Sequence, residues 1–239
     1  RWIQWRKSQT NLHPESSMFI YVLCCSAAEL SDGLCCFINE VKQPDGEPYA
    51  PDGLFYLCLS IQQYLLENRR MENIFSDVIY SKFSTEFTNK LRCFKPSVTA
   101  SGYVHSRVEE EFLWDCKQLG AYSPIVLLNT LLFFCCKYFG FTTVEQHHGV
   151  PESFLEVMEN TETILRCPVR LYKFYLSKCS ELVKRRSDLF YLQPDRSCVP
   201  SSPLWFSSAP LDYSIMEAML VRVLAVRELQ DDYDPAVCN

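Results

Sequence analysis

Apolar residues recur every three or four positions along most of this chain, which is the spacing of one face of an α-helix. Residues that favour helix ends agree with this pattern: Ser123-Pro124 suits the start of one segment, Gly140 its end, and Asp212 the start of the closing segment. The pattern predicts helices over residues 27–43, 54–68, 77–92, 106–119, 124–139, 169–179 and 213–229, with a short helix from Thr142 or Thr143 to His147.

The same spacing predicts which side chains face the interior. The segment 124–139 is apolar nearly all round, so it should be buried on most sides. In the helices at 27–43, 54–68, 77–92 and 213–229 the inward residues are expected to be Leu30, Leu34, Ile38 and Val41; Leu57, Ile61, Tyr64 and Leu65; Val78 or Ile79 with Phe83, Phe87 and Leu91; and Met216, Met219, Leu220, Val223 and Val226.

Two short strands and one boundary complete the predicted organisation. Residues 188–193 and 204–207 read as strands on either side of a proline- and serine-rich loop. The stretch 95–102 is polar and small, with one proline and one glycine, and is the best candidate for a domain boundary. We therefore expect a mixed N-terminal segment at 1–25, a helical domain at 26–98, a second mainly helical domain at 103–230, and an acidic tail at 231–239.

Composition supports a mainly helical, globular chain. Of 239 residues 48% are hydrophobic and only 7 are glycine, whereas average usage would give about 17 glycines. Barrels, sandwiches and glycine-rich phosphate loops are therefore disfavoured. The formal net charge of −6 lacks the basic excess of a strong nucleic-acid binder, which leaves only a local basic face open.

The 13 cysteines do not form a metal or disulfide pattern. Three adjacent pairs, 24–25, 35–36 and 135–136, lie in apolar stretches, and neighbouring side chains on a helix point about 100° apart. No C-x-x-C spacing occurs, and the four histidines complete no zinc pattern. We expect reduced thiols that pack as small hydrophobic residues, in a soluble intracellular protein without a signal peptide or membrane span.

Several long strings of residues resemble one known family. They cover nearly the whole chain, and strings of this length are highly specific. They are residues 37–42, 46–51, 56–65, 107–114, 123–124, 127–131, 137–147, 166–170, 175–178, 190–194 and 202–205. Together they resemble the C-terminal domain of the MYM-type zinc-finger proteins and of glutamine-rich protein 1.

This resemblance implies a fold and a cellular role. The family's domain is similar to a tyrosine recombinase captured from a Crypton-type DNA transposon, so 26–98 would be a core-binding-like helical part and 103–230 a degenerate catalytic-like part. Full-length relatives are nuclear transcriptional regulators that associate with chromatin-modifying corepressor complexes. One departure stands out: only residues 148–165 fill the place of a long insertion in the family, so a hairpin of the catalytic-like part should be shortened or missing.

The chemistry of a tyrosine recombinase is not complete in this sequence. Such an enzyme needs a tyrosine nucleophile, two arginines that hold the phosphate oxygens, and groups that move protons. The resemblance places Thr142 where the first arginine belongs, and the His-x-x-Arg motif of the second occurs nowhere. Tyr213 precedes the place of that motif, and Tyr233 lies among aspartates that would raise its pKa and repel a phosphodiester. We expect no enzymatic activity, no cofactor and no small-molecule substrate.

Two other groups of residues are candidates for function. His147-His148 with Glu145 could bind a metal, although surface or capping histidines are the commoner outcome. The only cluster of basic residues in the sequence is Lys184-Arg185-Arg186, with Arg166, Arg170 and Lys173 nearby. It could be an ordinary solvated face or a relic of a DNA-contacting surface. Trp205 could be core, or part of a partner groove left open by the missing hairpin. The possible nucleic-acid or partner contacts are Arg166, Arg170, Lys173, Lys184, Arg185, Arg186 and Trp205.

Two hypotheses about function follow. The leading one is a non-catalytic, nuclear interaction module of a transcription or chromatin regulator, with corepressor or other chromatin-modifying complexes as partners. The alternative is a catalytically dead DNA-binding module that keeps the recombinase clamp; the net charge of −6 predicts that such binding would be weak.

Overall fold

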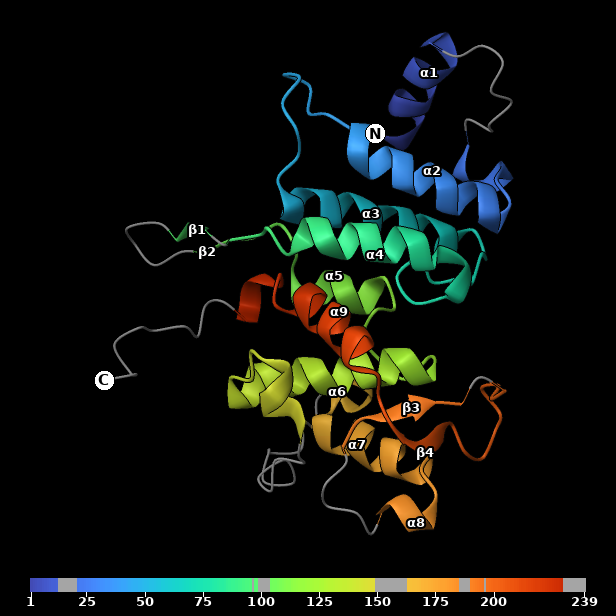
Figure 1. The fold of residues 1–239 in the computed structure, drawn as a ribbon, viewed down its shortest axis with the longest axis vertical. Coiled ribbons are helices and arrows are strands. Elements are labelled where there is room, and N and C mark those ends of the chain that lie inside the picture. The colour runs from blue at the N-terminus through green and yellow to red at the C-terminus, as the bar shows by residue number, and fades with distance from the viewer. Residues whose placement is uncertain are drawn as a thin grey trace. The chain divides into compact units, whose positions relative to one another are not determined.

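The computed structural model describes residues 1–12, 21–95, 97–98, 104–148, 163–184, 190–195 and 197–229 (Figure 1). The described chain is mainly helical with two short antiparallel strand pairs, which confirms the predicted class. It divides into two compact units, Arg1–Cys116 and Lys117–Asn239. Within the described ranges, we find no helix that combines the length and the apolar character required to cross a bilayer.

The first unit contains the helices predicted over 27–43, 54–68 and 77–92. Its elements in chain order are α1 (Trp2–Leu12), the 3-10 turn η1 (Val22–Cys24), α2 (Ala27–Glu40), α3 (Pro51–Glu67), η2 (Val78–Tyr80), α4 (Ser81–Leu91), β1 (Ser97–Val98), β2 (Val104–His105) and α5 (Glu110–Asp115). Strands β1 and β2 pair antiparallel, with Ser97 opposite His105.

Helix α2 begins where local chemistry favours a helix start. The Ser26 side chain accepts a hydrogen bond from the Glu29 backbone N–H, and the Glu29 carboxylate accepts one from the Ser26 backbone N–H at 2.8 Å. This reciprocal capping box satisfies two N–H groups that a helix start otherwise leaves without partners. The predicted inward stripe is confirmed, because all four of its residues are buried.

Aromatic packing holds α3 and α4 together. Phe83 and Phe87 of α4 stack at 5.7 Å, and Phe87 contacts Phe55 of α3 at 5.3 Å and Phe75 at 5.6 Å between ring centroids. The prediction that Phe83, Phe87 and Leu91 face inward is therefore confirmed. The expectation for Val78 or Ile79 is wrong, because both are exposed and Tyr80 fills the interior in their place.

The N-terminal residues form a helix that periodicity did not predict. Trp2 and Trp5 are buried against Phe37 of α2, with ring centroids 5.4 Å apart in each case. The Arg6 guanidinium lies 5.0 Å from the Trp2 ring centroid and 4.7 Å from the Trp5 ring centroid, in cation–π contact with both. Gly33 lets α1 approach closely, since a Cβ there would lie 2.6 Å from Arg6.

The inward face of α3 differs from the prediction. Ile61 and Leu65 are buried as expected, but Leu57 is half-buried and Tyr64 is exposed. The core-facing positions are Leu54, Phe55, Cys58, Leu59, Ile61, Gln62 and Leu65. The face is rotated because α3 packs against α4 and α5, with Phe55 in ring contact with Phe87 of α4.

The predicted helix at 106–119 is much shorter in the structure. Only Glu110–Asp115 is helical, and Ser106 does not cap it; its hydroxyl accepts from the Val108 N–H instead. The Arg107 N–H donates to Asp52 Oδ2 at 3.0 Å, which holds this segment against the first turn of α3. After the helix, Lys117 has a left-handed φ of 54°, so the helix cannot continue.

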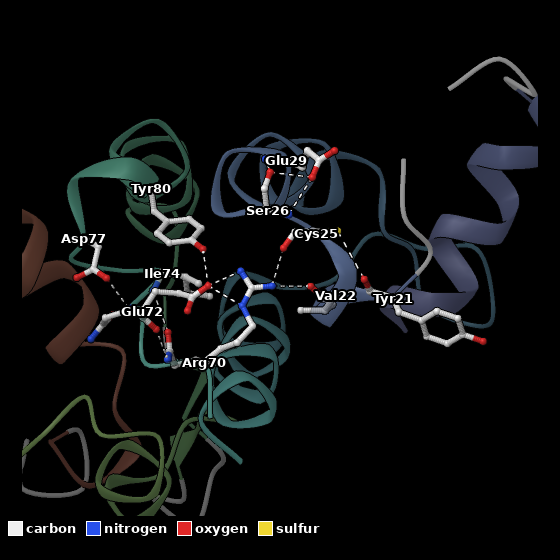
Figure 2. Close-up of polar contacts among 12 residues, drawn as sticks. Tyr21, Val22, Cys25, Ser26, Glu29, Arg70, Glu72, Ile74, Asp77 and Tyr80 are labelled. Carbon is white, nitrogen blue, oxygen red and sulfur yellow. Dashed lines mark hydrogen bonds and ion pairs between the residues drawn. The ribbon is translucent and has the colours of Figure 1, made fainter. Parts of the chain in front are cut away.

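A side-chain network ties the end of α3 to the start of α2 (Figure 2). Arg70 Nη1 donates to the carbonyl oxygens of Val22 and Cys25, at 2.9 and 2.7 Å. Its Nε donates to Glu72 Oε1 at 2.7 Å, and the Tyr80 hydroxyl donates to the same oxygen. Burial raises the pKa of Glu72, but the hydrogen bonds and charge of Arg70, a backbone hydrogen bond and the Tyr80 hydroxyl together outweigh it and lower that pKa.

The second unit is built around one helix that is buried on most sides, as predicted. Its elements are α6 (Pro124–Phe139), η3 (Val144–His148), η5 (Ile164–Arg166), α7 (Pro168–Ser177), α8 (Glu181–Lys184), β3 (Leu192–Pro194), β4 (Phe206–Pro210), α9 (Tyr213–Val223) and η6 (Arg227–Leu229). Helix α6 packs against α7 and α9.

The predicted ends of α6 and the start of α9 are confirmed. The Ser123 side chain accepts from the Val126 N–H, and Gly140 ends α6 with a left-handed φ of 65°. The Asp212 carboxylate accepts from the Ser214 N–H at the start of α9. The predicted inward residues of α9 and of the turn after it are all buried.

The two predicted strands pair antiparallel but are displaced. They cover 192–194 and 206–210, where 188–193 and 204–207 were expected, and Leu192 lies opposite Pro210. Residues 188–189 of the first predicted strand lie outside the described residues, as do residues 152–162, an acidic stretch of the sequence, and the tail at 231–239. The domain bounds 26–98 and 103–230 stay a prediction; in the structure the segment 104–116 belongs to the first compact unit.

Candidate interaction surfaces

The predicted basic residues are only partly brought together. Arg170 and Lys173 are exposed and lie three residues apart on α7, so they share one face of that helix. Arg166 is half-buried in η5, just before the helix. Lys184 in α8 forms an ion pair with Glu181 at 2.6 Å, which offsets its charge. Arg185 and Arg186 lie outside the described residues.

Trp205 is part of the core of the second unit. Its side chain is 3% exposed, and its ring meets Phe174 edge to face at 5.4 Å. Lys178 Nζ lies 4.8 Å from the Trp205 ring centroid and donates to the carbonyl of Ser202 at 2.8 Å. These contacts fasten the loop before β4 to α7. The alternative in which Trp205 lines an exposed groove is therefore wrong, and the core interpretation holds.

A buried polar cluster lies under η3. His147 Nδ1 is 2.9 Å from the Tyr191 hydroxyl, which donates to Cys135 Sγ at 3.3 Å, and His147 Nε2 is 3.9 Å from Cys136 Sγ. Tyr191 thus contacts both His147 and Cys135 through its single hydroxyl. Burial lowers the pKa of His147 to about 4 and raises that of Cys135 to about 12.

This cluster is structural in its chemistry. A thiol whose pKa is raised by burial is a poor nucleophile, and His147 is only 1% exposed. Among the described residues, no group of three or more His, Cys, Asp or Glu side chains has a geometry that could hold a metal ion. His147 therefore joins η3, which follows α6, to Tyr191, the residue before β3.

The segment that the resemblance aligns with a catalytic string forms a capped turn. The backbone N–H groups of Thr142 and Thr143 both donate to Gln146 Oε1, at 2.7 and 3.0 Å. The hydroxyl of Tyr213, one of the two tyrosines considered as nucleophile, donates to Glu145 Oε1 at 3.2 Å. This hydrogen bond joins the start of α9 to η3.

An apolar pocket with a volume of about 260 Å³ lies in the first unit between α1, η1, α2 and α3. Its buried lining is formed by Trp2, Val22, Phe37 and Ile61. None of the residues that line it is acidic, and only one, Arg1, carries a charge. The pocket therefore offers a concave apolar surface with a single cation at its edge.

The rim of this pocket is formed by large side chains that reach solvent. Ile3 is 42% exposed, Tyr21 57% and Tyr64 46%. Leu57 and Ser60 of α3 complete the wall between them. These side chains extend the apolar lining of the pocket to the surface around it.

Sequence reasoning missed this pocket because it assigned its wall to the core. The stripe Leu57, Ile61 and Tyr64 has helical spacing, and that spacing does not distinguish a core face from the wall of a pocket. The available signal was the second apolar stripe of the same helix, Leu54 and Cys58, which leaves α3 with two apolar faces and only one interior.

Family comparisons cover both units. A family model described as "QRICH1 domain" matches residues 1–94, and one described as "Domain of unknown function (DUF3504)" matches 104–151 and 149–225. The second match covers more than half of the chain, so the chain belongs to the DUF3504 family. No solved structure matches the chain significantly.

The relatives are those that the sequence resembled. The chain is 45% identical to zinc finger MYM-type protein 3 of Mus musculus, over 88% of this chain and 19% of that protein. It is 40% identical to zinc finger MYM-type protein 2 of Homo sapiens, over 86% and 18%, and 41% identical to the human transcriptional regulator QRICH1, over 86% and 32%. The resemblance is confirmed, and the chain spans about a fifth of the length of the MYM-type relatives.

The comparisons also bear on the expected departure near residue 150. The alignment with the mouse protein extends over 257 positions, more than the 239 residues of this chain, so that relative has residues without a counterpart here. The two DUF3504 matches meet at 149–151, within the place where the family insertion was expected to be missing.

Proposed function

We propose that this chain is a non-catalytic interaction domain of a nuclear regulator of transcription. The observation that supports it most is the family: relatives 40–45% identical include a protein named as a transcriptional regulator and proteins named as MYM-type zinc fingers. Nuclear location and partners of the corepressor or chromatin-modifying kind are part of the proposal.

The proposal includes a tyrosine-recombinase-like fold, inherited from a transposon, that no longer acts on DNA. The loss of activity on DNA is supported by two features of the 239 residues: no His-x-x-Arg string occurs, and Thr142 stands in place of an arginine. Without two cations that clamp the phosphate oxygens, negative charge cannot be stabilised in the transition state.

Two experiments test this function. A fluorescent fusion of the chain should concentrate in the nucleus, and affinity capture from nuclease-treated nuclear extract should recover subunits of a chromatin-modifying complex; an unrelated helical domain of similar size serves as the control. Diffuse fluorescence together with background capture would contradict the proposal. A covalent protein–DNA adduct on a nicked substrate would refute its non-catalytic part.

The alternative is a DNA-binding domain without chemistry, favoured by one observation. Arg170 and Lys173 are exposed on the same face of α7. If this face contacts phosphates, replacing both residues with alanine should weaken binding to duplex DNA and flatten the fall of affinity with salt by about two units of slope. The exposed Lys82, replaced with alanine, is the matched control. Binding unaffected by salt would exclude this alternative.

A further inference from the structure

We propose that the apolar pocket between α1, η1, α2 and α3 is a docking site for an amphipathic helix of a partner protein. The helix would insert two large apolar side chains one turn apart and present an acidic residue to Arg1. This inference rests on the proposed role as an interaction domain and assigns that role to one surface.

The size of the pocket favours side chains over a small-molecule ligand. Sites for drug-sized ligands have volumes of about 300–1,000 Å³, whereas a dry cavity of about 150 Å³ accepts one benzene molecule. The volume of about 260 Å³ lies between these values and suits two neighbouring apolar side chains. Side chains at i and i+4 of a helix enter such a groove together.

The hydrophobic core of the first unit is complete without a ligand in this pocket. The core of the unit is formed by the opposite face of α3, with Phe55 and Leu59, and by Phe83 and Phe87 of α4. The wall residue Tyr64 is left 46% exposed. Covering this wall would bury aromatic and aliphatic surface of the type that carries binding energy at protein interfaces.

The charge around the pocket favours an acidic partner. Arg1 Nη1 donates only to the neutral amide of Gln4, at 3.0 Å, and within the described chain it forms no ion pair. The helix α1 contains no acidic residue. Glu40 accepts a hydrogen bond from Trp5 Nε1 at 3.0 Å and is not one of the residues that line the pocket. An incoming carboxylate would therefore complement Arg1 without repulsion from the lining.

Selection from a phage-displayed library of random peptides about twelve residues long tests this proposal. Selection on the whole chain should enrich sequences with two large apolar residues spaced i, i+3 or i, i+4 and an acidic residue beside them. The enriched peptide is then labelled with fluorescein, and its affinity is measured by anisotropy. Enrichment of basic or patternless sequences, or no enrichment, would overturn the proposal.

Two pairs of variants locate the binding. Ser60→Trp places a large side chain into the pocket, and Gln63→Trp adds the same side chain to α3 outside the pocket lining. We expect Ser60→Trp to weaken the peptide at least about tenfold and Gln63→Trp to leave it unchanged. Arg1→Glu should weaken it about threefold, whereas Lys7→Glu, the same charge change on α1 away from the pocket, should have no such effect.

Four further results decide the remaining points. Circular dichroism melts of all four variants establish that each is folded, so lost binding reports on the pocket. Equal affinity for the wild type and Ser60→Trp would refute the assignment. A dimer that Ser60→Trp abolishes would give the pocket to a second copy of the chain and overturn the partner chemistry. Nuclear recruitment of the unaltered chain would still support the proposed function in either case.

Discussion

Replacing Arg70 with methionine should destabilise the first unit by about 3 kcal/mol. Methionine keeps most of the aliphatic stem but removes two hydrogen bonds to the carbonyls of Val22 and Cys25, and the ion pair with Glu72. Arg70 and Glu72 are 19% and 21% exposed in their side chains. Water can therefore replace part of each interaction, and we assign about 1 kcal/mol to each of the three.

Fluorescence can follow the first unit selectively. The chain has four tryptophans, of which Trp2, Trp5 and Trp114 lie in the first unit and Trp205 in the second. A Trp205→Phe background leaves all indole emission in the first unit. It also removes no hydrogen bond, because Trp205 Nε1 has no hydrogen-bond partner within the described chain.

Thermal and urea unfolding in this background should show the loss. A change of 3 kcal/mol corresponds to a fall in Tm of about 12 °C for a unit of this size. Lys7→Met, which removes an exposed cation from α1, serves as the control and should shift Tm by at most about 2 °C. A loss below about 1 kcal/mol for Arg70→Met would refute the view that this side chain joins η1 to the end of α3.

Three further predictions follow from other contacts. Burial lowers the pKa of His147 from 6.5 to about 4, so the unfolded chain binds more protons than the folded chain between these pH values. The free energy of unfolding should therefore be full above pH 6.5 and fall by up to about 3 kcal/mol as the pH drops to 4. His147→Phe should remove this pH dependence in urea titrations across that range. Burial lowers the pKa of Arg222 to about 10, and its Nη1 has no hydrogen-bond partner among the described residues. Arg222→Met should therefore leave the free energy of unfolding unchanged or raise it by about 1 kcal/mol. A decrease of about 1 kcal/mol, measured in thermal melts, would contradict this. Ser26→Ala should cost about 1 kcal/mol by removing the cap of α2, with Ser60→Ala, mid-helix, as a near-neutral control in the same assay.

Helix starts and ends were the most predictable features. Ser123 and Gly140 act within a few residues of themselves, through a side-chain oxygen and a left-handed backbone, so their effects are legible in the sequence. Two of the three adjacent cysteine pairs behave in the same local way: Cys25 and Cys35 are buried while their neighbours Cys24 and Cys36 are exposed. Cys135 and Cys136 are both buried, because α6 is buried on most sides.

Features that depend on distant partners were not predictable. The helix expected over 106–119 shortens because Asp52, more than fifty residues away, binds the Arg107 backbone. The N-terminal helix forms because Trp2 and Trp5 find Phe37 on another helix. Short isolated helices are only marginally stable in water, so their presence depends on such packing and not on propensity.

The sequence by itself determined the helical class, both ends of α6, the starts of α2 and α9, and membership in the DUF3504 family, because these depend on periodicity, caps and shared strings within single segments. The tertiary structure alone decided which face of α3 is interior, that Trp205 is covered, and that Leu57 and Tyr64 line an open pocket. Hydrophobic spacing marks a face as apolar. Whether this chain covers that face or leaves it exposed to a partner protein depends on where the neighbouring elements pack.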